Sequence, residues 1–377
     1  MSPELFEPAE GPSGGWPAGV EAERAYLAAF AGGSSALIAN LRTRVLALRS
    51  GDRVFPVTVN EAEYGDAYVC LPHSAYALYA KAELGIVDVG PWRPALAALA
   101  SGAGAAMRAA RLNQIVHIDN WMLSTNLHGG WAGEELDNIR ILVTGRFPGH
   151  FISIRSLTDW SDAALIGRLR RDGWRLLPAR QIWVTDDLDR DWAPRRDTRR
   201  DLRLLARTSY ALDSLQALRP GDAARIAELY AMLYLDRYST LNPAFTPAYI
   251  EMTHREQILT YRGLRGADGR LAAVVGCLVR GGVLTTPVVG YDTGRPAAEG
   301  LYRMASVLLA QVARERGARR NVSAGAAGFK RHRGARAMLE YTAYYAGHLA
   351  WPRRATLAAM ARILDSVAAP LLAERGL

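Results

Sequence analysis

The stretch SAGAAGFKRHRGA, residues 323–335, combines glycines with a short run of basic side chains. Glycine adopts backbone conformations that are closed to other residues, so a loop of this composition can turn its amide groups outward. These amides, together with Lys330 and Arg331, could hold a phosphate or a carboxylate. The alternative is a tight strand-to-turn connection with a solvated basic face, and the spacing leaves both interpretations open.

A second candidate anion site is the turn GYDTGRPAAEGLYR, residues 290–303. The pattern predicts a strand that ends at Gly290 and a helix that begins near Gly300. Free amides at a helix N-terminus attract phosphate groups. The turn matches neither G-x-G-x-x-G nor a Walker motif, so it predicts no Rossmann or P-loop site. An ordinary strand-to-helix connection is the alternative.

The order of elements around these two stretches resembles the GNAT acyltransferase superfamily, over about residues 220–350. Two strands, 271–280 and 283–290, are followed by a helix, 300–317, and a strand, 319–324. More narrowly, the chain resembles the tandem, Fem-like branch, in which a glycine-rich loop and an F-K-x-x-x-G segment follow the penultimate strand. The matching positions are Gly325, Gly328, Phe329, Lys330 and Gly334. The acetyl-CoA signature Q/R-x-x-G-x-G/A of the superfamily is replaced here by R-P-A-A-E-G, in which only Arg295 and Gly300 correspond.

The resemblance implies transfer of an acyl or aminoacyl group to the amine of a small molecule. The donor would be an acyl-CoA thioester or, as in Fem-like members, an aminoacyl-tRNA, and no metal is required. A non-catalytic module that binds an anion or nucleic acid is the alternative from another class. The donor would lie near Arg295, Gly300, Gly325, Gly328, Phe329, Lys330 and Arg331.

Four side chains near the expected cleft could accept the proton of the amine: Glu340, Tyr341, Tyr344 and Asp292. Strand alternation places Glu340 and Tyr341 on opposite faces, and likewise Tyr341 and Tyr344. For each of them, a role in the core or on the surface is the alternative. No Ser-His-Asp order and no H-E-x-x-H motif stands out, so neither covalent nor zinc catalysis is predicted.

Polar and aromatic side chains are also concentrated in IVHIDNWMLSTNLHGGW, residues 115–131. A strand that delivers such residues to a glycine loop suits a substrate pocket between domains. The alternative is a buried polar cluster that orders a long loop. The candidate substrate-binding residues are His117, Asp119, Asn120, Trp121, Asn126, His128 and Trp131, with Arg155 from HFISIRSL.

The element pattern predicts an α/β or α+β fold with two GNAT-like mixed-sheet halves in tandem. In the first half, 139–145 and 150–157 are predicted to form a hairpin. Residues 68–84 should be a strand leading into a helix, helix 93–112 should be interrupted at SGAG, and 189–207 should carry the linker. The predicted divisions are a disordered lead (1–20), a diverged first domain (21–205), a second domain (206–352) and a C-terminal amphipathic helix (353–377).

The net charge of +9 and the pI of about 9.7 favour anionic partners. The basic segments 195–207 and 351–364 could contact an RNA backbone, and the C-terminal helix could contact an anionic membrane; solvated faces are the alternative. Two distant cysteines, Cys70 and Cys277, predict neither a disulfide framework nor a zinc site. Without a signal-peptide pattern or an apolar run of roughly 18 residues, the chain is expected to be cytoplasmic.

Overall fold

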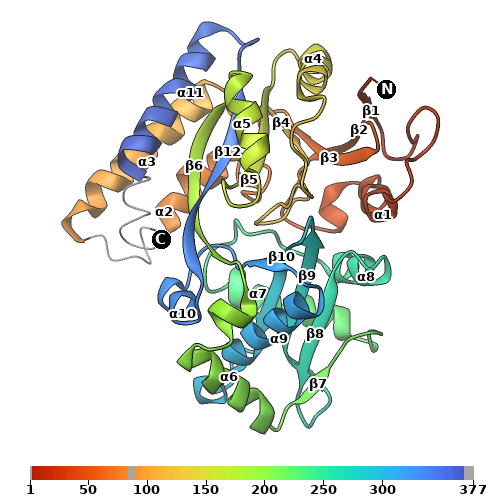
Figure 1. Ribbon diagram of the computed structural model, residues 1–377. Helices are drawn as coiled ribbons and strands as arrows, with labels where there is room; N and C mark the ends of the chain where they lie inside the picture. The colour runs from red at the N-terminus through yellow and green to blue at the C-terminus, as the bar shows by residue number, and fades with distance from the viewer. Residues whose placement is uncertain (1, 84–89, 369–377) are drawn as a thin grey trace.

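A twelve-stranded mixed sheet runs through the computed structural model, which describes residues 2–83 and 90–368 (Figure 1). The mixed α/β class predicted from the sequence is confirmed. The strands are β1 (Glu4–Phe6), β2 (Arg44–Ser50), β3 (Arg53–Asn60), β4 (Ile115–Ile118), β5 (Phe151–Leu157), β6 (Arg175–Thr185), β7 (Ala211–Asp213), β8 (Thr260–Arg265), β9 (Leu271–Arg280), β10 (Val283–Tyr291), β11 (Arg319–Asn321) and β12 (Arg336–Tyr345). Their order in the sheet is β1-β2-β3-β4-β5-β12-β6-β11-β10-β9-β8-β7.

The same pairing pattern occurs once in each half of the chain. Strands β1 to β4 pair antiparallel in sequence order, and β4 then pairs parallel with β5. Strands β7 to β10 repeat this order, and β10 pairs parallel with β11. A parallel pair needs a crossover connection, which α4 (Leu136–Arg146) and α9 (Leu301–Glu315) provide. The repeat supports the interpretation of two copies of one fold.

Each half gives its last strand to the other half. β12, from the end of the chain, pairs antiparallel with β5 of the first half, and β6 of the first half pairs antiparallel with β11. β6 and β12 also pair with each other from Arg336↔Val184 to Tyr344↔Arg175. The exchange joins the halves into one continuous sheet and puts β6 and β12 at its centre.

The helices cover both faces of the sheet in groups. α1, α7 and α8 share one apolar core, α6 packs with α9, α4 packs near α5, and α3 packs with α11. Because α1 belongs to the first half and α7 and α8 to the second, the first core also spans the junction. The remaining helices are α1 (Glu21–Phe30), α2 (Ala80–Glu83), α3 (Arg93–Ala109), α5 (Ala163–Arg171), α6 (Arg196–Arg207), α7 (Asp222–Tyr234), α8 (Pro247–Arg255), α10 (Ala327–His332) and α11 (Trp351–Ile363).

Residues 139–145, predicted as a strand of a hairpin, belong to helix α4 instead. Ile139 and Val143 are four residues apart and both fully buried, which is a helical spacing. A helix is required here because β4 and β5 run parallel. The β-rich composition of this segment therefore gave the wrong prediction.

Several smaller predictions also differ from the structure. The lead contains β1, where Phe6 packs on Trp16, so it is not wholly disordered. Residues 68–72 form no strand and precede a π-helical turn (Ser74–Tyr79). Helix α3 continues through SGAG. The charged run 189–207 contains α6, the loop GFKRHRG contains α10, and the part of the predicted C-terminal helix beyond residue 368 lies outside the described residues.

The two parallel strand pairs separate after a short contact. β4 and β5 pair at three positions, from Ile115↔Phe151 to His117↔Ser153. β10 and β11 pair at two positions, Val283↔Arg319 and Leu284↔Arg320, although β10 continues to Tyr291. The sites described below lie beside these two points of separation.

Candidate active site at the junction of the halves

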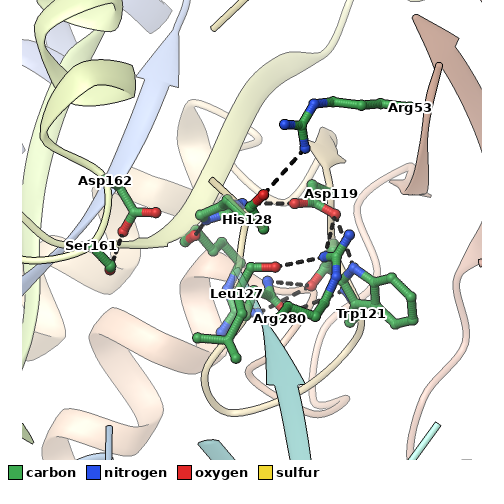
Figure 2. A network of polar contacts seen from close by, with 12 residues as sticks. Arg53, Asp119, Trp121, Leu127, His128, Ser161, Asp162 and Arg280 are labelled. Atoms are coloured by element: carbon green, nitrogen blue, oxygen red, sulfur yellow. Dashed lines mark hydrogen bonds and ion pairs between the residues drawn. The ribbon is translucent and has the colours of Figure 1, made fainter. Parts of the chain in front are cut away.

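Asp119, which follows β4, is the centre of a buried polar network (Figure 2). Its Oδ2 lies 2.8 Å from Nδ1 of His128, and its Oδ1 accepts a hydrogen bond of 2.9 Å from the Trp121 indole. Nε2 of His128 lies 2.7 Å from the carbonyl oxygen of Arg155. Since both ring nitrogens of His128 face acceptors, the ring is a donor on both sides and carries a positive charge.

The pKa values of this pair shift in the directions that an ion pair requires. Burial by itself would raise the pKa of Asp119, but the charge of Arg280 and the hydrogen bond from His128 outweigh it and lower that pKa. Burial by itself would lower the pKa of His128, but the hydrogen bond and charge of Asp119 outweigh it and raise that pKa. The two residues therefore form a buried ion pair.

Arg280, at the end of β9, links this network to the second half (Figure 2). Its Nη1 donates to the carbonyl oxygen of Leu127 at 2.6 Å and lies 3.4 Å from Asp119, while its Nη2 donates to Glu23 at 3.1 Å. Its guanidinium also lies over the Trp121 ring, 4.5 Å from the centroid. The network thus fixes the loop after β4 to a strand of the other half.

The other predicted substrate-binding residues of this stretch are also turned inward. Asn120 donates to Thr58 and to the carbonyl oxygen of Val69, and its Oδ1 accepts from Asn126. His117 lies between Ser153 and the carbonyl oxygen of Cys70, and burial, with the charge of Arg155, lowers its pKa to about 3. His117, Asp119, Asn120, Trp121, Asn126, His128 and Trp131 are each at most 2% exposed. Their polar contacts favour the alternative of a cluster that orders the loop.

Arg155, on β5, differs from those seven residues because it is only half buried. Its Nη1 donates to Asn120 at 3.2 Å and to the carbonyl oxygen of Leu123 at 3.3 Å. Among the described residues, no hydrogen-bond partner is found for its Nε and Nη2. Burial, offset in part by Tyr68 and other neighbours, lowers its pKa. Donors of this guanidinium are therefore available to a ligand.

Beside Arg155, an ion pair connects the two exchanged strands. Nε and Nη2 of Arg180, on β6, donate to the two carboxylate oxygens of Glu340, on β12, at 2.8 and 3.1 Å. Nη2 also donates to Thr125 at 2.8 Å and to the carbonyl oxygen of Ser124. Burial by itself would lower the pKa of Arg180, but Glu340 outweighs it and raises that pKa. Glu340, predicted as a base, is 2% exposed and committed to Arg180 on both oxygens.

Lys330, predicted to bind the donor, is committed to the backbone of its own loop. Its ammonium donates to the carbonyl oxygens of Val322, Ser323 and Ala324, at 2.6, 3.1 and 2.7 Å. Burial, together with the charges of Arg180 and Arg320, lowers its pKa to about 7. The lysine therefore holds the end of β11 against α10.

A cluster of tyrosines adjoins Arg180. Tyr68 and Tyr79 lie 5.1 Å apart between ring centroids, and both interact with Arg180 and with Tyr234 of α7. Tyr302, at the start of α9, also interacts with Tyr234, and burial raises its pKa to about 12. We use the name junction site for Arg155, Arg180, Lys330 and Glu340 with Tyr68, Tyr79 and Tyr234. Sequence reasoning missed Arg180 and these tyrosines, because nothing local marks them as neighbours of residue 340.

Of the remaining candidate bases, Tyr344 lies beside the junction site, and Tyr341 and Asp292 lie elsewhere. Tyr341 packs in the cluster of α4 and α5, whereas Tyr344 packs on the opposite face, as strand alternation predicts. Tyr344 lies near Tyr76 and Arg155, and burial raises its pKa. Asp292 accepts from Arg225 of α7 at 2.7 Å, at the far end of β10.

The predicted anion site at the start of α9 is covered by α6. Gly300 has a φ of +70°, and a Cβ there would lie 2.5 Å from the Leu204 side chain. Asp201 of α6 accepts from Arg303 and from Arg333, at 2.6 Å each. Side chains of α6 therefore already occupy the space in front of this helix terminus, and Arg303 and Arg333 there are bound to Asp201.

The other predicted donor-binding residues lie in two places, Arg295 beside the end of β10 and the rest in or near α10. Arg295 lies 3.8 Å from both Asp268 and Asp292, and over the Tyr210 ring. The Phe329 ring packs on Tyr302, and the Cζ atom of Arg333 lies 3.5 Å from the centroid of the Phe329 ring. Gly325 has a φ of +78° in the loop, and Gly328 lies inside α10. Arg331 is exposed, and its guanidinium lies over the Trp183 ring. Within the described part of the chain, no three His, Cys, Asp or Glu side chains are arranged as metal ligands.

Solved structures that are similar to this chain include FemX and GCN5-related N-acetyltransferases, and the similarity expected from the sequence is therefore found, at low identity. The C-terminal domain of a putative lysylphosphatidylglycerol synthetase from Agrobacterium fabrum is 16% identical over 66% of this chain and 80% of its own, with a TM-score of 0.45. FemX is 10% identical over 55% of this chain and 76% of its own, with a TM-score of 0.43. A GCN5-related N-acetyltransferase from Kribbella flavida is 15% identical over 63% of this chain and 84% of its own, with a TM-score of 0.33. No family model and no curated protein matches the chain.

Proposed function

We propose that this chain transfers an aminoacyl group from aminoacyl-tRNA to an amine at the junction site. The observation that carries the proposal is the half-buried guanidinium of Arg155 beside the Arg180–Glu340 pair, near the point where β4 and β5 separate. Its unused donors suit a carboxylate or phosphate group of a substrate. The tyrosines beside Arg180 add apolar surface with polar tips, which suits a small polar acceptor.

Transfer to an amine requires a fixed donor carbonyl and donors that stabilise the developing oxyanion. Arg155 can supply charge-assisted hydrogen bonds without losing a partner. Glu340 positions Arg180 through both carboxylate oxygens, and Lys330 positions the loop after β11 through three carbonyl oxygens. In this arrangement Arg155 contacts substrate, whereas Glu340 and Lys330 are positioning residues.

Two features of α6 favour tRNA over acyl-CoA as the donor. Its inner side covers the start of α9 with Leu204 and Asp201, where the resemblance places the coenzyme diphosphate. Its outer side carries exposed arginines, and Arg333, which bonds Asp201, joins α6 to the helix of Lys330. A basic helix face of this kind attracts a nucleic-acid backbone. The exposed arginines are Arg195, Arg196, Arg199, Arg200, Arg203 and Arg207.

The test is the loss of a labelled aminoacyl group from tRNA in the presence of candidate amines, with a matched series of acyl-CoAs. We expect turnover with aminoacyl-tRNA, and a fall of about 10- to 100-fold in Arg155→Gln, since a hydrogen bond to a charged group contributes about 1.5–3 kcal/mol. The melting temperature of Arg155→Gln should match the wild type, because its two protein hydrogen bonds are long. Turnover of acyl-CoA alone would establish the thioester donor, and no turnover of either would favour a binding module.

Binding is measured separately on the α6 surface. In the triple variant Arg199→Gln, Arg203→Gln, Arg207→Gln, the salt dependence of tRNA binding should weaken by about 0.7–0.9 in the log–log slope for each lost phosphate contact. Exposed arginines elsewhere provide the control, in Arg255→Gln, Arg270→Gln, Arg316→Gln. Equal slopes in the two triple variants would place tRNA on another surface.

A further inference from the structure

Helices α3 and α11 form the outermost layer on one side of the molecule (Figure 1). Arg353, near the start of α11, donates to the carbonyl oxygens of Ala110 and Arg111, which follow the end of α3. The start of one helix therefore lies beside the end of the other. We call the outward side of this pair the α3–α11 face.

Large apolar side chains are exposed at both ends of the α3–α11 face. Trp351 is 73% exposed at the start of α11, and Trp92 is 66% exposed immediately before α3. Leu99 and Ile363 are also exposed, so four of the seven exposed large apolar side chains of the described chain lie here. Between the tryptophans, the exposed positions of α3 are mostly small residues: Ala95, Ala98, Ser101, Gly102, Ala105, Ala106 and Ala109.

The charge on this layer has one sign. Neither α3 nor α11 contains Asp or Glu. Arg93, Arg111, Arg354 and Arg362 are exposed, and none of the four has a carboxylate partner among the described residues. Of the residues that follow α11 up to 368, Asp365 is the acidic one. An apolar surface between aromatic ends and unpaired arginines complements an anionic bilayer surface, where tryptophan lies at headgroup level and arginine meets phosphate.

We infer that the α3–α11 face binds the surface of an anionic membrane, with the helices lying in its plane. At 1.5 Å per residue, α3 alone would lie along roughly 25 Å of that surface. No helix within residues 2–83 and 90–368 is long and apolar enough to cross a membrane, so contact by this face would be peripheral. The inference does not depend on the proposed transfer reaction.

The experiment is co-sedimentation of the full chain with vesicles of equal parts phosphatidylcholine and phosphatidylserine, against vesicles of phosphatidylcholine alone. We expect binding to the mixed vesicles only, weakened by salt. Arg93→Gln, Arg111→Gln, Arg354→Gln and Arg362→Gln should each lower the partition coefficient about fivefold, as expected for one cationic side chain near an anionic surface. Trp92→Ser combined with Trp351→Ser should lower it by at least about tenfold.

The matched control is the double variant Ile141→Ser, Leu212→Ser. It replaces two apolar residues that lie outside the α3–α11 face and are 60% and 57% exposed. This variant should bind as the wild type does, and thermal melts should show that all variants fold. Absence of wild-type binding, or equal loss in the control, would overturn the inference. Self-association without lipid that disappears in the tryptophan variant would assign the face to a second copy of the chain instead.

Discussion

The two parallel strand pairs share one topology and differ in what surrounds the point where they separate. Beside β4 and β5, Asp119 and His128 are buried and bound to each other, and Arg280 of the second half completes their network. Beside β10 and β11, the cations Arg320 and Lys330 have no carboxylate at ion-pair distance among the described residues. Asp119 thus has cationic partners at contact distance, whereas the buried cationic groups beside β10 and β11 have no carboxylate partner within the described residues.

This difference shows that equivalent points in two similar halves can have different roles. At the first point of separation, the network of Asp119 and His128 is a structural connection between the halves, because its polar atoms bind each other and Arg280 of the second half, while Arg155 beside it keeps donors for a ligand. The second lies beside Arg180 and Lys330, with a local excess of positive charge that an anionic substrate would neutralise. Buried charge without a partner costs stability, so its presence indicates a functional constraint.

The largest expected effect on stability follows from removing the carboxylate charge of Asp119 from its network with His128 and Arg280. Asp119→Asn leaves the charges of His128 and Arg280 buried near each other, and the free energy of unfolding should fall by about 3–5 kcal/mol. Urea denaturation measures this, with Glu23→Gln as a control that removes the other, more exposed partner of Arg280 and should cost less, because Arg280 keeps its contacts with Asp119 and Leu127. An Asp119→Asn variant with wild-type stability and lost ligand binding would break the comparison, since the network of Asp119 and His128 would then bind the ligand and not connect the halves.

A smaller effect of opposite sign is expected at the second point of separation. Arg320 is 3% exposed, its Nη2 donates to Thr185, and its Nε is buried without a partner; burial lowers its pKa to about 10. Arg320→Met should raise the free energy of unfolding by about 1–4 kcal/mol, because an apolar side chain replaces a buried unpaired charge.

The control for Arg320 is Arg265, which is 4% exposed but paired with Asp213 and Asp222. Arg265→Met should lower stability, since it leaves those carboxylates without their partner. If both variants lower the urea midpoint alike, Arg320 is compensated within the fold and the difference between the two halves disappears.

The smallest effect is a dependence of stability on pH in the first network. Because the pKa of His128 is raised above 6.5 in the folded chain, its contribution is complete below pH 6.5 and is lost as the pH rises through the raised value. The slope is at most about 1.4 kcal/mol per pH unit. His128→Gln should remove this contribution, so its pH dependence should differ from that of the wild type, whereas His332→Gln, at an exposed position, should keep the wild-type dependence. The same pH dependence in His128→Gln and in the wild type would mean that His128 is neutral.

The sequence predicted the second half well and the first half less well, for a physical reason. Strands β8 to β10 and helix α9 have regular patterns bounded by glycine turns, and local patterns suffice for such elements. Helix α4 contains Ile, Leu, Val and Thr, so its composition favours a strand, and only the parallel pairing of β4 with β5 requires a helix. Residues 68–79 form irregular backbone whose conformation depends on tertiary contacts.

The candidate site shows the same limit. The alternation along β12 correctly separated Glu340 from Tyr341, because that is a local property of a strand. The pairing of Glu340 with Arg180 joins residues 160 positions apart across exchanged strands, and no local pattern encodes it. The stretch around His117 stood out by composition, but composition does not reveal whether polar side chains face a ligand or each other.

Because β12 lies at the end of the chain, β5 is synthesised long before the strand that pairs with it. When β5 leaves the ribosome, its antiparallel partner β12 has not been made, since the partner begins at Arg336 and β5 ends at Leu157. At about 5–20 residues per second, β5 waits roughly 10–40 s with one edge unpaired. During that interval the first half cannot complete its sheet, and the nascent chain presents an open strand edge on which a chaperone could act.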